Sequence, residues 1–179
     1  LNLLITGGAG FIGLNLINMI INDNYFEKII VIDKLQYGQD FQKLYKKSNI
    51  NFVKGDITNH ALIDEILLKC SVSHIIHLAA ESHVDNSIIS PKDFINSNII
   101  GTFTLLESFK KHWYQNGKNN LWRFLHVSTD EVFGSLKEND FPFSESSKYE
   151  PNSPYSASKA SSDHLVRAWN KTYELPTII

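Results

Sequence analysis

Short runs of apolar and β-branched residues recur along the chain, and segments with apolar residues at helical spacing separate them. Buried strands are predicted at residues 1–6, 28–33, 50–54, 74–78 and 122–128. Helices are predicted near residues 11–21, 40–47, 59–69, 93–114 and 154–173. A further strand is predicted to start within residues 176–179.

This alternation predicts an α/β fold. Right-handed crossovers would give a doubly wound, Rossmann-type parallel sheet with helices on both faces, and ligands are expected at the carboxyl ends of its strands. The apolar pattern already begins at Leu1, and the pattern of the last strand is cut off as it starts. We therefore interpret the 179 residues as one domain, a fragment of a longer chain.

The composition of the chain limits which binding partners and which cellular compartment are expected. The chain has 17 basic and 19 acidic residues, a net charge of -2, and no block of like charge, so no nucleic-acid partner is expected. No apolar stretch is long enough to span a membrane, and the single Cys70 cannot form an internal disulfide. We therefore expect a cytoplasmic protein with no membrane partner.

A glycine-rich turn follows the first predicted strand, with Gly7, Gly10 and Gly13 leading into a helix. Gly7 would permit a tight bend, Gly10 a close approach of the backbone to a pyrophosphate, and Gly13 close packing of helix on strand. Phe11 and Ile12 lie in the first helical turn, whose free N–H groups attract phosphate. A glycine-rich turn without a ligand is the alternative interpretation.

The second predicted strand ends at Asp33, where a carboxylate can accept hydrogen bonds from adenosine ribose hydroxyls. An acid there repels a ribose 2′-phosphate, so NAD is favoured over NADP as the cofactor. No arginine lies near Asp33, although Lys34 slightly weakens this argument. Lys34 and Leu35 belong to the same candidate cofactor site.

The ends of the next two strands supply further candidates for the cofactor site. Asp56 and Ile57 could flank an adenine, although Asp56 could instead belong to a helix-start signal. Leu78, Ala79 and Ala80 end the fourth strand, and the two small residues leave room for a dinucleotide. Tight packing at the strand end would also explain them.

Tyr155 and Lys159 lie one turn apart on the last predicted helix. The lysine charge is expected to lower the pKa of the tyrosine, so that the phenolate takes a proton from a sugar hydroxyl during hydride transfer. The lysine could also hold the nicotinamide ribose. An exposed, non-catalytic pair is the alternative, but the glycine turn and Asp33 favour the redox interpretation.

Asp130 and Glu131 follow the fifth predicted strand, at the same sheet edge as the glycine turn. A general acid beside a general base suits the elimination of water. A solvated acidic junction is the alternative. The longest irregular stretch, residues 134–152, is either a substrate-covering loop or an ordinary connection. No metal site is predicted, because His74 and His77 point to opposite faces of their strand.

Five motifs together resemble the extended short-chain dehydrogenase/reductase family, and within it the nucleotide-sugar 4,6-dehydratases. They are residues 6–13 (TGGAGFIG), 77–85 (HLAAESHVD), 98–102 (NIIGT), 128–134 (STDEVFG) and 151–159 (PNSPYSASK). The resemblance covers essentially the whole chain. Two positions depart from the family pattern, with Asn86 in place of the usual arginine and Ser97 in place of the usual threonine.

The resemblance implies a three-step cycle on a nucleotide sugar, with dTDP-glucose favoured. Tyr155 and Lys159 would assist oxidation at C4, after which Glu131 would remove the C5 proton while Asp130 protonates the departing C6 hydroxyl. The hydride would then return to C6. The remaining implied contacts are Thr129 on the C4 oxygen, Ser82 on substrate or nicotinamide, and Ser97 on the cofactor.

The family also implies a homodimer and a substrate-binding region that follows this NAD-binding domain. UDP-glucose and GDP-mannose dehydratases and UDP-sugar 4-epimerases are close alternatives, although an epimerase does not need Asp130 and Glu131 for loss of water. A non-catalytic NAD-sensing module is a remote alternative, because it does not need Tyr155 and Lys159 at catalytic spacing.

Overall fold

The computed structural model of the chain describes residues 1–22, 25–36 and 49–179. Within these ranges one parallel sheet has the strand order β3-β2-β1-β4-β5-β6. The strands are β1 (Asn2–Thr6), β2 (Lys28–Asp33), β3 (Ile50–Lys54), β4 (His74–His77), β5 (Arg123–His126) and β6 (Thr177–Ile178). The helices are α1 (Phe11–Ile20), α2 (His60–Lys69), α3 (Val84–Ile89), α4 (Pro91–Phe94), the π-helix η2 (Ile95–Ile100), α5 (Gly101–Gln115), the 3-10 helix η3 (Asp130–Phe133) and α6 (Pro154–Tyr173).

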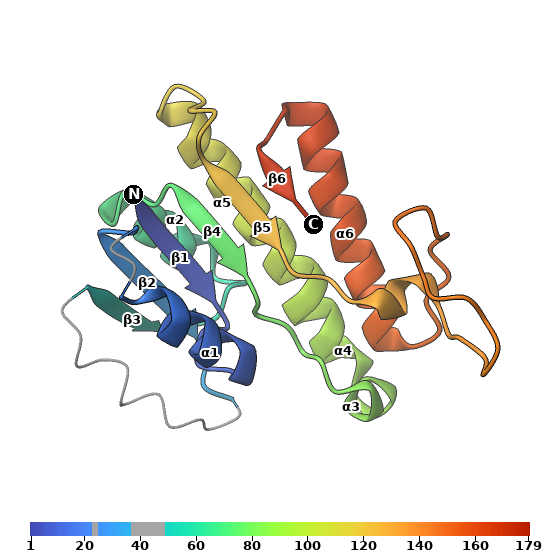
Figure 1. The fold of residues 1–179 in the computed structure, drawn as a ribbon. Coiled ribbons are helices and arrows are strands. Elements are labelled where there is room, and N and C mark those ends of the chain that lie inside the picture. The colour runs from blue at the N-terminus through green and yellow to red at the C-terminus, as the bar shows by residue number, and fades with distance from the viewer. Residues whose placement is uncertain (23–24, 37–48) are drawn as a thin grey trace.

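The sheet is doubly wound, as the sequence predicts. The strand order reverses between β1 and β4, which places a crevice at the carboxyl ends of these two strands. In Figure 1, α1 lies on one face of the sheet, and α2 and α5 lie on the other. Side chains alternate along β1, so Leu3 and Ile5 pack toward α1, whereas Leu4 packs toward α2 and α5.

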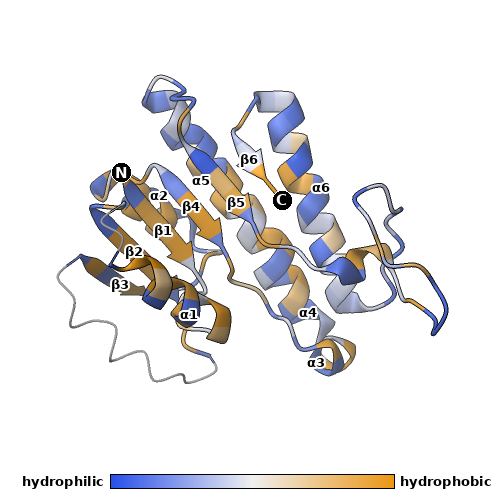
Figure 2. Ribbon diagram, viewed as in Figure 1, coloured by the Kyte–Doolittle hydropathy of each residue, from blue (hydrophilic) through white to orange (hydrophobic). Residues whose placement is uncertain are grey.

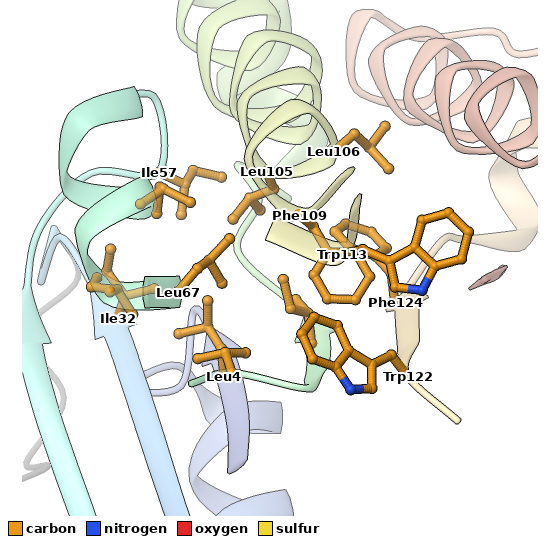
Figure 3. Close-up of a cluster of buried hydrophobic side chains, with 14 of the residues drawn as sticks. Leu4, Ile32, Ile57, Leu67, Leu105, Leu106, Phe109, Trp113, Trp122 and Phe124 are labelled. Atoms are coloured by element: carbon orange, nitrogen blue, oxygen red, sulfur yellow. The ribbon is translucent and has the colours of Figure 1, made fainter. Parts of the chain in front are cut away.

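The larger core lies on the face covered by α2, α5 and α6 (Figure 3). Phe109 of α5 is fully buried there, with its ring 6.0 Å from that of Trp122 and 5.8 Å from that of Phe124. The central strands are mostly apolar, with polar residues at their ends, and each helix has both apolar and polar positions (Figure 2). Among the described residues, no helix combines the length and the hydropathy of a membrane span.

Phe109→Ala should lower the free energy of unfolding by about 3–5 kcal/mol, because the cavity it leaves is lined by rigid aromatic rings. Urea unfolding followed by circular dichroism measures this change. The matched control is Leu121→Ala, at a side chain that is 68% exposed, which should change stability by no more than about 0.5 kcal/mol. Equal effects of the two variants would contradict the burial of Phe109.

The structure corrects several predicted boundaries. Strands β4 and β5 end at His77 and His126, before the predicted ends, although single backbone hydrogen bonds continue the ladder to Leu78 and Val127. The predicted helix 93–114 is divided into α4, η2 and α5, and the helix α3 and the short helix η3 were not predicted. The predicted helix at 40–47 lies outside the described residues.

Candidate active site

A cavity of about 500 Å³ opens at the carboxyl edge of the sheet. Every residue that the sequence proposes for the cofactor lines it. These residues are Gly7, Gly10, Phe11, Ile12, Gly13, Asp33, Lys34, Leu35, Asp56, Ile57, Leu78, Ala79, Ala80, Ser82, Ser97, Tyr155 and Lys159. The structure thus brings together segments from the whole length of the chain, while their contacts with a cofactor stay predictions.

The glycine turn is so tightly packed that side chains cannot fit at two of its positions. Gly7 has a φ of 69°, and a Cβ there would lie 2.6 Å from the Ala79 backbone nitrogen. A Cβ at Gly13 would lie 2.5 Å from the Cα of Gly8. Gly10 precedes the first turn of α1 and donates its N–H to the Gly7 carbonyl over 3.1 Å. The free N–H groups of α1 therefore border the cavity.

Gly13→Ala should destabilise the chain by roughly 1–3 kcal/mol, because its methyl group must push α1 away from the turn. The displaced turn should also bind dinucleotide more weakly. Thermal unfolding and calorimetric titration with NAD measure the two effects. The control is Asn18→Ala, at an exposed position of the same helix, which should match the wild type in both measurements. Normal NAD affinity in Gly13→Ala would contradict the role of this packing.

Asp33 is held in place by the backbone on both sides. One carboxylate oxygen accepts the Ala9 N–H over 3.1 Å, and the other accepts the Leu35 N–H over 2.8 Å. Leu35 has a left-handed φ of 59°, which is uncommon outside glycine and brings its N–H back toward Asp33. The Lys34 ammonium lies 2.7 Å from the carboxylate of the buried Glu81. The Lys34 ammonium, next to Asp33 in the sequence, is therefore paired with the Glu81 carboxylate.

Both interpretations of Asp56 are compatible with its place in the structure. It lines the cavity together with Ile57, and one of its carboxylate oxygens accepts the backbone N–H and the hydroxyl of Thr58. The cap of helix α2 is Asn59, whose side chain accepts the N–H of Leu62. Asp56 therefore shapes the turn before the helix while it borders the cavity.

Tyr155 and Lys159 lie on the inner face of α6, where both side chains are mostly buried. The Lys159 ammonium donates a hydrogen bond to the Val127 carbonyl over 2.5 Å. Burial lowers the pKa of Lys159 to about 8, and the nearby Asp163 carboxylate opposes this change. A substantial fraction of Lys159 is therefore charged at neutral pH.

The expectation that the tyrosine pKa is lowered is wrong for this structure. Burial raises the pKa of Tyr155, and the charges of Glu131, Asp130 and Asp163 raise it further. A hydrogen bond with the Thr129 side chain acts in the opposite direction. Lys159 lies one helical turn from Tyr155, but the effects that set the direction of the tyrosine pKa are desolvation and the neighbouring carboxylates.

Thr129, Asp130 and Glu131 are not among the residues that line the cavity, and they lie just beyond Ser128, which does. Thr129 caps the short helix η3 by accepting the Glu131 N–H over 3.3 Å. Its contact with the Tyr155 hydroxyl brings this triplet to the redox pair. Asp130 is exposed and Glu131 is half-buried, so the two carboxyl groups lie in different surroundings.

Some residues that connect the parts of the site were not predicted from the sequence. Asn98, within the π-helix η2, accepts the Glu81 N–H over 2.8 Å and donates to the Glu81 carbonyl and to the Ser158 hydroxyl. It thereby ties the segment after β4 to α6. The buried Asp163 was also missed, although it continues the spacing of Tyr155 and Lys159 by one further turn. Other cavity-lining residues that were not proposed are Ala9, Ile32, Gln36, Gly55, Glu81, His83, Val127 and Ser128.

The family model described as GDP-mannose 4,6 dehydratase matches residues 4–179. The chain belongs to this family. A dTDP-glucose 4,6-dehydratase of Haemophilus influenzae is 48% identical to this family member over 184 residues, which cover 100% of the chain and 54% of that protein. The chain thus spans about half the length of the curated relatives it matches.

Solved structures of dehydratases and epimerases resemble this GDP-mannose 4,6-dehydratase family member. DesIV of Streptomyces venezuelae, a dTDP-glucose 4,6-dehydratase solved with NAD and TYD bound, is 40% identical with a TM-score of 0.88. The match covers 99% of the chain and 54% of DesIV. A UDP-glucose 4-epimerase of Thermotoga maritima, solved with UDP-glucose, is 30% identical with a TM-score of 0.84, over 99% of the chain and 53% of the epimerase. The resemblance to nucleotide-sugar dehydratases and the Rossmann-type fold are thereby confirmed.

Proposed function

We propose that the full-length protein is an NAD-dependent dTDP-glucose 4,6-dehydratase, a lyase that forms a 4-keto-6-deoxy sugar nucleotide. The lining of the cavity carries this proposal, because the glycine turn and the pair Tyr155 and Lys159 border the same cavity, and Ser128 at its edge directly precedes the Thr-Asp-Glu triplet. The relatives named dTDP-glucose 4,6-dehydratase, among them that of Haemophilus influenzae, support the choice of sugar nucleotide.

The cavity suits a dinucleotide with an unphosphorylated ribose. Its floor is the turn where Gly7 and Gly13 leave no room for a side chain, which suits close approach of a pyrophosphate. Asp33 stands at the end of β2, and Lys34 is paired with Glu81, so the acid is not neutralised by its neighbour. These features favour NAD over NADP. When bound, NAD would supply the hydride acceptor for C4 and, in its reduced form, the hydride donor for C6.

In this proposal each proton transfer is carried out by a different side chain. Tyr155 takes the proton of the C4 hydroxyl, with Lys159 as its positive neighbour and Thr129 as hydrogen-bond partner of the reacting oxygen. Glu131 removes the C5 proton, which a C4 ketone makes acidic, and Asp130 protonates the departing C6 hydroxyl. Ser82 and Ser97 line the cavity. In this proposal Ser82 contacts substrate or nicotinamide, and Ser97 contacts the cofactor.

Incubation of the full-length protein with dTDP-glucose, UDP-glucose and GDP-mannose in turn tests the proposal. Mass spectrometry should detect loss of one water from dTDP-glucose, with NAD returned to its oxidised form. Loss of water from another sugar nucleotide instead would assign the base differently. Conversion of UDP-glucose to its C4 epimer without loss of mass would favour the epimerase, and no change in any substrate would favour an NAD-sensing module.

We further propose a cytoplasmic homodimer in which residues 1–179 form the NAD-binding domain with the catalytic residues. The outer faces of η2 and α5 support the dimer, because Ile100 and Phe103 are 45% and 41% exposed. Phe103 also meets Trp169 of α6 edge-on at 5.9 Å, so the two helices share this apolar surface. Light scattering of the full-length protein should give the mass of two chains, and Phe103→Glu should lower it to that of one.

A further inference from the structure

Three residues at successive turns of α6, namely Tyr155, Lys159 and Asp163, contact the chain that leaves β5. Tyr155 contacts the Thr129 side chain, and Lys159 binds the Val127 carbonyl. The proposed chemistry uses the first two of these residues. It gives no role to Asp163, although this carboxyl side chain is only 1% exposed and must therefore be stabilised by partners.

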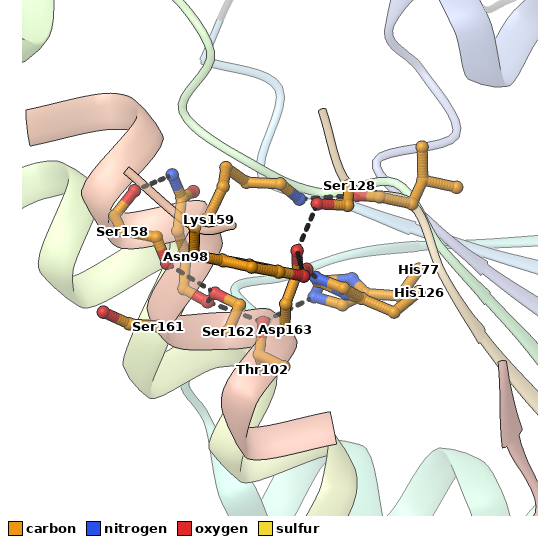
Figure 4. Close-up of polar contacts among 12 residues, drawn as sticks. His77, Asn98, Thr102, His126, Ser128, Ser158, Lys159, Ser161, Ser162 and Asp163 are labelled. Atoms are coloured by element: carbon orange, nitrogen blue, oxygen red, sulfur yellow. Dashed lines mark hydrogen bonds and ion pairs between the residues drawn. The ribbon is translucent and has the colours of Figure 1, made fainter. Parts of the chain in front are cut away.

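Asp163 has partners on the segment formed by the end of β5 and the residues after it, and on the segment 134–152. Figure 4 shows its contacts with Ser128 and His126. One carboxylate oxygen accepts the Ser128 hydroxyl over 2.6 Å and the Tyr149 hydroxyl over 3.0 Å. The other lies 3.2 Å from Nε2 of His126, a close polar contact rather than a well-directed hydrogen bond. Ser128 directly precedes the triplet, so Asp163 fixes the backbone on which the triplet is mounted.

Tyr149 connects Asp163 to the far end of the long segment 134–152. Its ring meets Phe133 edge-on at 5.4 Å and lies 4.9 Å from the ring of His164. Burial, followed by the Asp163 charge, raises the pKa of Tyr149 to about 12. The phenol therefore keeps its proton and donates to the carboxylate throughout the working pH range.

Asp163 has a second effect, because its charge acts on the protonation of Lys159. Burial alone would raise the pKa of Asp163, but the contact with His126 and the hydrogen bonds outweigh burial and lower the pKa. The carboxylate is therefore negative near Lys159. Within the described residues, the other titratable groups near this lysine are His77 and His126 on the sheet, whose pKa its charge lowers, and Tyr155, one turn earlier on α6. Burial lowers the pKa of both histidines and raises that of Tyr155, so all three are neutral near pH 7.

We propose that Asp163 is a positioning residue of the active site. Its carboxylate binds Ser128, which precedes the triplet, and Tyr149, at the end of the following segment, and so holds both to the helix that carries Tyr155 and Lys159. Because it is buried one helical turn from Lys159, its negative charge also favours the ammonium form of that lysine. The catalytic consequence rests on the proposed function, whereas the contacts and the charge do not.

Asp163→Asn tests the effect of the charge, because it removes the charge and keeps the shape. Full-length protein labelled with ¹³C at the lysine ε carbons reports protonation of Lys159 in a pH titration, and Lys159→Arg identifies its resonance. The wild type should titrate at about pH 8, and Asp163→Asn about one pH unit lower, since a missing negative neighbour disfavours the ammonium. The alkaline limb of kcat should move by the same amount. Equal midpoints in the two proteins would overturn the proposal.

Tyr149→Phe and Ser128→Ala separate positioning from charge, because each removes one hydrogen bond to Asp163 and leaves the carboxylate in place. Both should leave the Lys159 midpoint where it is. Tyr149→Phe should speed amide hydrogen exchange in residues 134–152 and raise KM, and Ser128→Ala should speed exchange in residues 127–133 and lower kcat. Unchanged exchange and kinetics in both variants would overturn the positioning role, even if Asp163→Asn fails to fold.

These measurements also distinguish a failure of this inference from a failure of the proposed function. The lysine titration and the hydrogen exchange need no substrate. A wild type that dehydrates no sugar nucleotide would contradict the dehydratase, while the shift of the Lys159 midpoint would still decide the role of Asp163.

Discussion

Glu131→Gln should stop dehydration while leaving oxidation at C4 intact. The amide cannot remove the C5 proton, and Tyr155 and Lys159, which act at C4, are unchanged. Formation of dehydrated product should fall roughly 10²- to 10⁴-fold, the usual contribution of one general base. After mixing with dTDP-glucose, the reduced nicotinamide should therefore accumulate and remain. Its near-ultraviolet absorbance, together with mass spectrometry of the product, measures the two steps separately.

Asp130→Asn is the matched control for this prediction. It should also lose dehydrated product, because the C6 hydroxyl lacks its acid, but Glu131 should still exchange the C5 proton with solvent. In deuterated water, sugar recovered from Asp130→Asn should carry deuterium at C5, and sugar recovered from Glu131→Gln should not. Product formation at the wild-type rate in Glu131→Gln would remove Glu131 from the mechanism.

Tyr155→Phe should block the cycle one step earlier. Without the phenol nothing takes the C4 hydroxyl proton, so the rate of cofactor reduction in a single turnover should fall roughly 10²- to 10⁴-fold. The fold should survive, because the phenyl ring keeps its edge-on contact with Phe94 at 6.3 Å. Rapid-mixing absorbance on the full-length protein measures the reduction step, and calorimetry checks that NAD still binds.

Tyr114→Phe provides the comparison, since this tyrosine is 45% exposed at the end of α5 and does not line the cavity. Its reduction rate should equal that of the wild type. Undiminished turnover in Tyr155→Phe would contradict the redox role of the phenol and favour a module that senses NAD without using it.

The features predicted correctly from sequence are those with local causes. Alternating apolar and polar segments predict the parallel sheet, because each strand must be buried on both faces and each helix on one. The turn with Gly7 and Gly13 was recognisable because only glycine fits where a Cβ would overlap backbone atoms. Asp33 lies at the end of β2 as predicted, because the apolar run of that strand ends there.

The features that sequence reasoning missed depend on contacts between distant segments. Asn98 and Ser158 meet only in the folded chain, and neither belongs to a spacing that predicts their hydrogen bond. The raised pKa of Tyr155 has a similar origin: spacing gives its proximity to Lys159, but not the burial of the phenol or the nearby carboxylates. Asp163 was the exception, because its helical spacing was visible and only its partners were not.

The π-helix η2 allows the two ends of one long helical segment to face different parts of the structure. An extra residue in a helix rotates everything before it by about 100° relative to everything after it. Ser97 can therefore border the cavity while Leu105 and Phe109 of α5 stay in the core. A deletion within residues 95–100 would restore an ordinary helix and force a choice between the two alignments. Evolution could thus alter ligand contacts at this end without repacking the interior at the other.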